Sequence, residues 1–411
     1  MKLQVMAYRL CWLLIPLFAL AQSNTNTPAP PPDAAEVQQE IQQVESLLPK
    51  IPDRGAALFL LAHDYAHVGS LEKAWSLLKE CMSLEEGFDP DVDPDFAPLK
   101  ARSEFQSLIE KLHRRYPAVH RAHVAFTVPE KDLIPEGLVA DPTTGVLYMG
   151  SLNRRKIVKI TKNGDVSDLV QAGQYNLGPI CGLKVDASDE SLWANTCPDN
   201  GAGAELLHFD SAGKLADRFP PPTPGQHLFN DLVLRNTQEI YLTDSLANLT
   251  YRFNRKSRTF TEVLLYRPVY FPNGIALSDD GNLLYIADAF GIVQLDLRND
   301  SSHEVVPGPR NTVSCADGLY WYRNSLVAIQ NGLFESRRVA QFRLAPDGFT
   351  VTATAILEYR SPLVTRPTTG AIVGSKFYFM SNTQVNNFKN EKIIDPAKLA
   401  PVKISVVELQ K

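Results

Sequence analysis

The feature that most constrains this chain is a block of sequence that recurs six times between residues 135 and 382. Each block is a short apolar strand, a polar turn and a second strand that often carries Tyr or Trp, as in PNGIALSDDGNLLYIAD from Pro272. The opening residues lie 43 to 52 positions apart and are Glu136, Cys181, Asn230, Asn273, Asp317 and Thr369. A period of this length predicts one small antiparallel sheet for each repeat.

Six such sheets arranged around an axis form a six-bladed β-propeller, which we expect over residues 122–411. The first strands would then surround a central channel, with the opening residues around one mouth. Further strands are expected at 123–129 and 402–410, outside the six blocks. Pairing these two strands in the last blade would close the ring and leave no sheet edge exposed.

Residues 36–118 have a helical pattern and predict a small α-helical module ahead of the mainly β domain. The stretch LAHDYAHVGSLEKAWSLLKECMS, residues 61–83, carries Ala, Tyr, Gly and Ala at intervals that resemble a tetratricopeptide repeat. One or two repeats cannot build the concave groove of such proteins. The module is therefore interpreted as a cap or as a docking site for a protein partner.

His63 and His67 have the spacing of the zinc-protease motif, with Asp64 in place of its glutamate. Histidines four residues apart on a helix can share a metal ion. Aspartate is one methylene shorter than the glutamate that activates water, however, and the sequence shows no third ligand. The repeat pattern already explains Tyr65 and Ala66 as packing residues, so packing is the preferred interpretation.

The first 21 residues have the pattern of a secretory signal peptide, with Lys2 and Arg9 ahead of a short apolar run. Residues 22–35 are rich in proline and predict a flexible linker. These features predict a secreted or periplasmic protein. A formal net charge of −5 without a basic stripe argues against nucleic acid as a partner, and no later stretch is apolar enough to predict a membrane span.

Four cysteines follow the predicted signal peptide. Cys181 and Cys197 flank an expected hairpin, so they can either form a disulfide, which export would permit, or remain buried thiols. We expect buried thiols. Cys81 falls in a helical pattern and Cys315 in a strand context, and neither has an obvious partner in the sequence.

Four of the six opening residues carry a side-chain oxygen: Glu136, Asn230, Asn273 and Asp317. Oxygen ligands that converge from rigid elements suit a hard cation such as Ca²⁺ or another divalent ion. Each residue alone is explained by a common turn dipeptide such as Asn-Gly or Asp-Gly. Their joint occurrence at one position of the repeat instead predicts a metal site, with coordination positions left for water or substrate.

With these blocks, the chain from about residue 122 to 410 resembles the senescence-marker-protein/gluconolactonase family of six-bladed propellers. The paraoxonases and diisopropyl-fluorophosphatases are more distant relatives. PEGLVAD, FND, PNGIALSDDGNLLYIAD and ADG carry the resemblance. It implies that Glu136, Asn230, Asn273 and Asp317 bind a divalent metal, usually calcium, and that lactones or esters are hydrolysed there.

Three positions depart from the patterns of these families. Leu228 stands where gluconolactonase-like members often have an arginine that contacts sugar acids, so a more apolar substrate is expected. Cys181 and Thr369 stand where paraoxonases and diisopropyl-fluorophosphatases, respectively, carry histidine. His227 lies near the mouth in sequence, and we expect it to be a surface loop residue.

These observations predict a secreted, calcium-dependent hydrolase of small lactones or esters. We expect Asp317 and Asn230 to be the catalytic residues, with Asp317 deprotonating the attacking water unless a metal-bound water needs no separate base. The alternative is a non-catalytic propeller that serves as a binding scaffold, with its helical module docking a partner.

Overall fold

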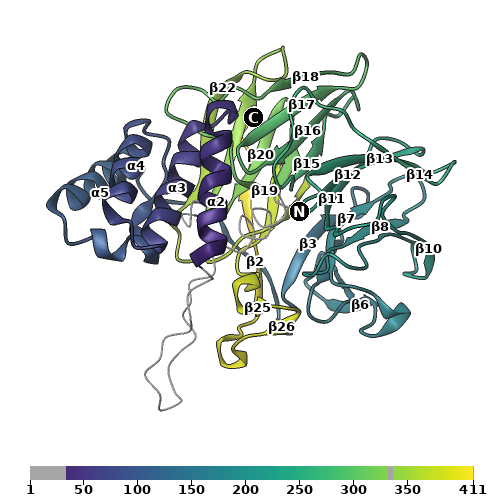
Figure 1. The fold of residues 1–411 in the computed structure, drawn as a ribbon. Helices are drawn as coiled ribbons and strands as arrows, with labels where there is room; N and C mark the ends of the chain where they lie inside the picture. The colour runs from purple at the N-terminus through teal and green to yellow at the C-terminus, as the bar shows by residue number, and fades with distance from the viewer. Residues whose placement is uncertain (1–33, 332–336, 411) are drawn as a thin grey trace.

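A computed structural model describes residues 34–331 and 337–410, and it confirms a mainly β fold with a six-bladed propeller and N-terminal helices (Figure 1). The predicted signal peptide and nearly all of the predicted linker lie outside the described residues. None of the helices in the described ranges has the length and apolar character needed to cross a bilayer. The helical part contains α2 (Ala34–Leu47), η1 (Leu48–Lys50), α3 (Arg54–His67), α4 (Leu71–Ser83), η2 (Pro90–Val92), η3 (Pro94–Leu99) and α5 (Ser103–Arg115).

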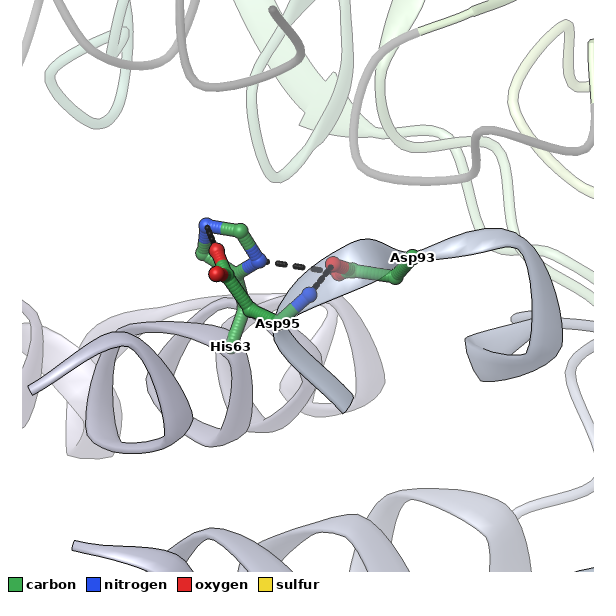
Figure 2. A group of neighbouring side chains, drawn as sticks. All are labelled: His63, Asp93 and Asp95. Carbon is green, nitrogen blue, oxygen red and sulfur yellow. Dashed lines mark hydrogen bonds and ion pairs between the residues drawn. The ribbon is translucent and has the colours of Figure 1, made fainter. Parts of the chain in front are cut away.

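Helix α3 is the centre of this helical module. Asp53 caps its N-terminus by accepting a hydrogen bond from the Ala56 backbone N–H (3.0 Å), and Gly69, at φ 77°, makes the turn into α4. Most of its residues are buried against α2 and α4. On another face, His63 Nδ1 lies 2.8 Å from Asp93 Oδ2, a contact that ties α3 to the start of η3 (Figure 2).

The propeller consists of six antiparallel sheets with at least four strands each. In chain order the blades are β3 to β6 (Pro135–Ala140, Leu147–Ser151, Ile157–Ile160, Val166–Val170), β7 to β10 (Ile180–Val185, Leu192–Thr196, Leu206–Phe209, Leu215–Phe219), β11 to β14 (Phe229–Leu234, Glu239–Asp244, Leu249–Asn254, Thr259–Glu262), β15 to β18 (Ile275–Leu277, Leu283–Asp288, Gly291–Asp296, Ser301–Glu304), β19 to β22 (Ala316–Trp321, Ser325–Gln330, Arg338–Leu344, Val351–Tyr359), and a last blade of β23, β24, β27 and β2 (Gly370–Val373, Lys376–Met380, Val402–Glu408, His123–Val128). Strand β1 (Val119–His120) extends the fifth blade, and β25 (Phe388–Lys389) and β26 (Lys392–Ile393) form a hairpin within the long connection from β24 to β27.

The ring is closed in the predicted way. β2 pairs antiparallel with β27, from His123 opposite Val406 to Val128 opposite Val402. The first strands of neighbouring blades contact one another in a full circle, from β3 through β7, β11, β15, β19 and β23 back to β3. This arrangement brings all six opening residues to the same end of the propeller, which we call the mouth.

The helical module packs on the mouth end of the fourth and fifth blades, against the turn between β16 and β17 and the segment that precedes β19 (Figure 1). Its core is continuous with Ala289 and Phe290, between β16 and β17, and with Cys315, just before β19. Asp53 also connects the helical module to the propeller. Its second carboxylate oxygen accepts hydrogen bonds from the hydroxyls of Ser314 (2.6 Å) and Thr312. The module is therefore anchored to the segment that leads directly into Asp317.

One expectation about the cysteines was wrong. Cys181 and Cys197 form a disulfide across the β7–β8 hairpin, with their Cα atoms 6.0 Å apart, within the range that such a bond spans. Cys181 lies where the register of the hairpin shifts, and Cys197 directly follows β8, with its N–H donating to the Pro179 carbonyl (3.0 Å). Cys81 and Cys315 are both buried.

Candidate metal centre at the propeller mouth

The opening residues share a local irregularity of the backbone. In four blades the pairing of the first strand with the second shifts register at this position, namely after Pro135, Ile180, Phe229 and Ala316. Such a bulge bends the strand and re-aims the side chain that follows. In the fourth blade Asn273 precedes β15 and is held by its N–H, which donates to the Ala287 carbonyl (2.9 Å).

Glycine follows the opening residue in five blades, and in the first, second, fourth and fifth of them the next blade comes very close to it. A Cβ on Gly137 would overlap the carbonyl oxygen of Cys181, and one on Gly274 would overlap that of Asp317. Each of these glycines therefore lets one blade approach the opening residue of the next. The Pro-Asn-Gly sequence is thus explained by close packing at the axis and not by a hairpin turn.

Three of the four oxygen-bearing positions follow a strained residue. Ile134, Phe271 and Cys315 have φ of 45°, 50° and 58°, and each lies two positions ahead of Glu136, Asn273 or Asp317. Left-handed backbone is rare for residues other than glycine and costs about 1–3 kcal/mol, so it persists where surrounding contacts impose it. The recurrence of this strain marks these positions as functional candidates.

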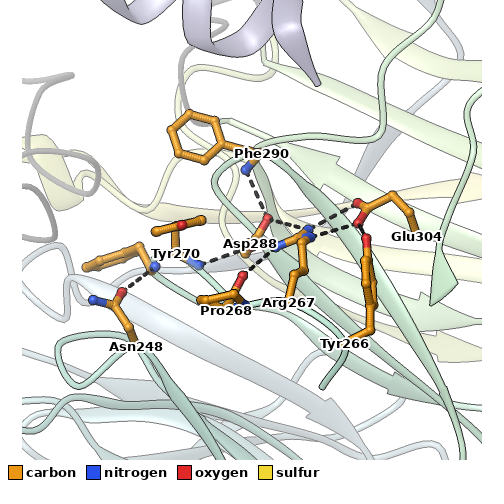
Figure 3. A network of polar contacts seen from close by, with 9 residues as sticks. Asn248, Tyr266, Arg267, Pro268, Tyr270, Asp288, Phe290 and Glu304 are labelled. Atoms are coloured by element: carbon orange, nitrogen blue, oxygen red, sulfur yellow. Dashed lines mark hydrogen bonds and ion pairs between the residues drawn. The ribbon is translucent and has the colours of Figure 1, made fainter. Parts of the chain in front are cut away.

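A buried ion-pair network imposes the backbone path that leads to Asn273 (Figure 3). Arg267 contacts Asp288 (2.5 Å) and both carboxylate oxygens of Glu304 (2.8 and 3.0 Å). The same oxygen of Asp288, Oδ2, also accepts a hydrogen bond from the Tyr270 N–H (3.1 Å). Asn248 accepts the N–H of the left-handed Phe271 (2.7 Å), so the chain reaches Asn273 along a fixed course.

Three of the predicted site residues, Glu136, Asn273 and Asp317, lie close enough together to affect the pKa values of the two carboxyl groups. Burial, and then the charge of Asp317, raise the pKa of Glu136 well above its usual range. Burial raises the pKa of Asp317 to about 7, although hydrogen bonds from Asn331 (2.5 Å) and Asn273 and the charge of Arg366 act in the opposite direction. Two carboxylates this close favour either a shared proton or a cation.

Oxygen atoms without partners define the centre of this group. Glu136 Oε2, Asn273 Oδ1 and Asp317 Oδ1 are buried and accept no hydrogen bond within the described residues. Buried polar atoms normally have a partner, so three such oxygens from three blades indicate a place for a ligand that supplies positive charge. Asn230, which is 7% exposed, joins the group less directly. Its Nδ2 donates to Ser245 Oγ (3.1 Å), and that hydroxyl donates to the carbonyl of Pro272, next to Asn273.

Sequence reasoning missed several buried polar residues around the ring. Arg366, 8% exposed, provides positive charge near Glu136 and Asp317 and donates to the backbone carbonyl of Asn331 (3.4 Å). Asn331 also donates to the Pro367 carbonyl (2.6 Å), which holds its amide against Asp317. Arg366 and Asn331 lie just outside the repeated sequence blocks, in the loops next to them. A comparison of the blocks alone therefore could not identify them.

A second polar group involves the first strands beyond the opening residues. Lys184 on β7 pairs with Asp231 on β11 (3.1 Å), the residue that takes the place of glycine in the third blade. Burial, and then the charge of Asp231, raise the pKa of Tyr320 on β19, whose hydroxyl accepts the Gly370 N–H (2.6 Å). These contacts link four first strands across the channel.

The expectation that His227 is a surface residue was wrong. It is 4% exposed, and its Nδ1 lies 2.6 Å from Asp244 Oδ2 while its Nε2 lies 2.9 Å from the Thr223 carbonyl. Both ring nitrogens are therefore occupied. The histidine fixes the proline-rich 219–229 segment that enters the third blade, and its pKa is raised by the hydrogen bond to Asp244.

The other departures from the family patterns also find a structural explanation. Cys181 is in the disulfide, and Thr369 donates its hydroxyl hydrogen bond to the backbone carbonyl of Glu136. Leu228 packs at the mouth against an apolar cluster that includes Ile134, Leu152 and Phe388. The mouth thus combines a buried oxygen-rich centre with an apolar wall.

The fold and the site together define a six-bladed propeller with an oxygen-lined centre at one mouth of its channel. A scan against protein-family models finds no match, and no curated protein matches the chain. Solved structures with a similar fold include a gluconolactonase from Xanthomonas campestris (15% identity, TM-score 0.49, covering 72% of this chain and 97% of that one) and virginiamycin B lyase from Staphylococcus aureus (16%, 0.48, 71% and 99%). A luciferin-regenerating enzyme is similar to the same degree (12%, 0.48, 69% and 94%). At such low identity these similarities carry no conclusion about activity, which has to be argued from the residues of the site.

Proposed function

We propose that this protein is a metal-dependent hydrolase of lactones or esters, with a divalent cation such as Ca²⁺ held by Glu136, Asn230, Asn273 and Asp317. The single observation that carries the proposal is the set of buried oxygens on Glu136, Asn273 and Asp317 that lack a hydrogen-bond partner in the described part of the chain. Two carboxylates and two amides suit a hard cation, because the amides add oxygens without adding charge repulsion.

A divalent cation in this place supplies Lewis acidity that polarises a carbonyl group. Among the protein's own residues, Asp317 is proposed to accept the proton of the attacking water, and Asn230 to orient the reacting groups beside it. Asn331 holds the Asp317 carboxylate in position by a hydrogen bond, and the charge of Arg366 favours its ionised form. The apolar cluster around Leu228 favours an apolar substrate over a sugar acid.

The disulfide between Cys181 and Cys197 supports the further proposal that the protein is exported to the periplasm or the cell exterior. Disulfides persist in oxidising compartments and are uncommon in the cytosol. Detection of this bond in protein isolated from the native host, together with loss of the first 21 residues, would establish export. A full-length N-terminus on a reduced protein would contradict it.

The direct test is turnover of a panel of lactones and aryl esters before and after treatment with a chelator. We expect activity to disappear with the chelator and to return with Ca²⁺. Asn273→Ala should weaken Ca²⁺ binding and activity by about tenfold or more, because it removes a ligand oxygen and even the loss of a group that supports a ligand has an effect of that size. Asn282→Ala, in the turn at the other end of the same blade, is the matched control and should change neither. Activity that is indifferent both to chelation and to Asn273→Ala would refute the mechanism.

A further inference from the structure

The central channel ends in a cavity of about 440 Å³ on the side opposite the mouth, which we call the far cavity. Its wall includes the last residues of four first strands and one residue of β23, namely Val185, Leu234, Leu277, Trp321 and Ile372. Because the first strands begin at the mouth, their last residues place this cavity at the other end of the channel. A volume of this size is within the range of small-molecule sites, about 300–1,000 Å³.

Trp321 gives the far cavity an apolar wall that is held in place from behind. Its ring stacks on Tyr285, with centroids 5.6 Å apart and planes 20° apart. Tyr285 is fully buried, and its hydroxyl donates a hydrogen bond to the Gly348 carbonyl (2.8 Å). Leu277 and Ile372 are half-buried in the same wall. Apolar side chains around a concave site favour a ligand with an apolar body.

Two basic side chains also line the far cavity, and each is paired with an acid that does not line it. Lys184 pairs with Asp231 (3.1 Å), and Arg235 pairs with Glu239 (2.8 Å). The side chains of Lys184 and Arg235 are 21% and 24% exposed, whereas those of Asp231 and Glu239 are 6% and 18% exposed. Each pair therefore presents its positive member to the cavity.

The acidic residues of the wall have less influence on a ligand. Asp279 and Asp280 are both exposed, in the turn between β15 and β16. The Asp280 carboxylate accepts hydrogen bonds from the Ser278 hydroxyl (2.5 Å) and the Asn282 N–H (3.1 Å) within its own turn. Solvent and salt screen exposed charges more than partly buried ones, so the two bases dominate the interior of the cavity.

Lys184 and Tyr320 both line the far cavity and both have hydrogen atoms to donate. An ammonium group has three N–H bonds, and Asp231 Oδ1 accepts from Lys184 Nζ at 3.1 Å, which leaves donors for a ligand. The Tyr320 hydroxyl accepts the Gly370 N–H (2.6 Å), so its own hydrogen remains available to an acceptor. A carboxylate accepts several hydrogen bonds and complements the lysine charge.

From these observations we propose that the far cavity binds a small apolar carboxylate, with its charged group at Lys184 and its apolar body against Trp321, Leu277 and Ile372. Asp231 is the positioning residue, because it holds the ammonium group of Lys184. This site is separate from the oxygen-rich centre, and the proposal is independent of the hydrolase proposed above.

The test compares three probes that share a phenyl ring and differ in the charge of the head group: benzoate, benzamide and benzylamine. Their binding to the full-length protein is measured by calorimetry with a chelator present, so that benzoate cannot bind an ion at the mouth, and again in excess Ca²⁺. We expect one benzoate per chain, with an affinity at least about tenfold higher than that of benzylamine, because hydrogen bonds to charged groups are strong. The affinity should be the same in both conditions. Benzoate binding that requires Ca²⁺ would place the probe at the mouth and overturn the proposal.

Lys184→Met should lower benzoate affinity by about tenfold or more, because it removes the charged donor. Lys214→Met is the matched control, because Lys214 is exposed in the turn between β9 and β10 of the same blade, and this variant should bind normally. Lys184→Met leaves Asp231 without its partner, so circular dichroism is used to check the fold. If this variant does not fold, Ile372→Glu replaces it, since a negative charge in the wall should also weaken benzoate binding. Equal affinities for the three probes, or unchanged benzoate binding in a folded cavity variant, would refute the assignment.

Discussion

Gly274 is one of the residues at which a single added carbon atom would disturb the geometry of the ring. An added Cβ would overlap the Asp317 carbonyl oxygen and approach the backbone nitrogen of Leu319 (2.6 Å). We expect Gly274→Ala to reduce the free energy of unfolding by about 1–3 kcal/mol, the usual range for overpacking. It should also weaken Ca²⁺ binding, since relief of the overlap displaces Asp317.

The control for this substitution is Gly308→Ala. Gly308 has an ordinary φ, and the nearest atom to an added Cβ is the Val351 carbonyl oxygen at 3.8 Å. This variant should stay within about 0.5 kcal/mol of the wild type in urea unfolding. Equal unfolding midpoints for the two variants would show that the blades are not in tight contact at Gly274.

The ring residues could be found in the sequence because each one occupies the same place in a repeated unit. Their periodic spacing predicted that Glu136, Asn230, Asn273 and Asp317 would share one mouth. Arg366 and Asn331 could not be found in this way, because their positions depend on how loops between blades fold back on the channel. His227 was misassigned for a similar reason: loop position predicts exposure, whereas its contact with Asp244 on β12 buries it.

At the level of the elements, the conformation of the segment between β14 and β15 depends on the buried guanidinium group of Arg267. The Arg267 side chain is 10% exposed and forms ion pairs with both Asp288 and Glu304. The Asp288 side chain is fully buried, at 0% exposed. We expect Arg267→Ala to cost about 3–5 kcal/mol, because it leaves buried carboxylates without a counter-charge. The change should appear as a lower urea midpoint.

Arg298→Ala is the appropriate comparison for this pair. Arg298 is also in the fourth blade and forms an ion pair with Asp296, but its side chain is 61% exposed. Its removal should cost less than about 1 kcal/mol, since exposed ion pairs contribute little. A small effect for Arg267→Ala would mean that the network does not hold the approach to Asn273.

On the scale of the complete fold, the sequence predicted both parts but not how they join. Helical and strand periodicities are local signals, so they identify the two parts from short stretches of chain. The docking of the helices on the fourth and fifth blades depends instead on contacts such as Asp53 to Ser314, across more than 250 residues.

The junction between helices and propeller makes the stability of the whole protein depend on pH through Glu86. This residue lies close enough to Asp53, the N-cap of α3, and to Arg338 of β21 for both charges to act on it. Burial, and then the charge of Asp53, raise the pKa of Glu86 to about 8, although Arg338 acts in the opposite direction. Between the unfolded value near 4.5 and about 8, the native state therefore holds a proton that the unfolded chain releases.

Because the native state binds more protons over this interval, the contribution of Glu86 is fully present below about pH 4.5 and is lost as the pH rises through about 8. We expect the melting temperature of the wild type to fall relative to that of Glu86→Gln between pH 5 and 9, since glutamine keeps the neutral shape without titrating. Parallel melting profiles across this range would contradict the assignment. Glu85→Gln is the control, because the pKa of Glu85 is lowered by its hydrogen bond with Lys111, so its charge is constant over the same interval.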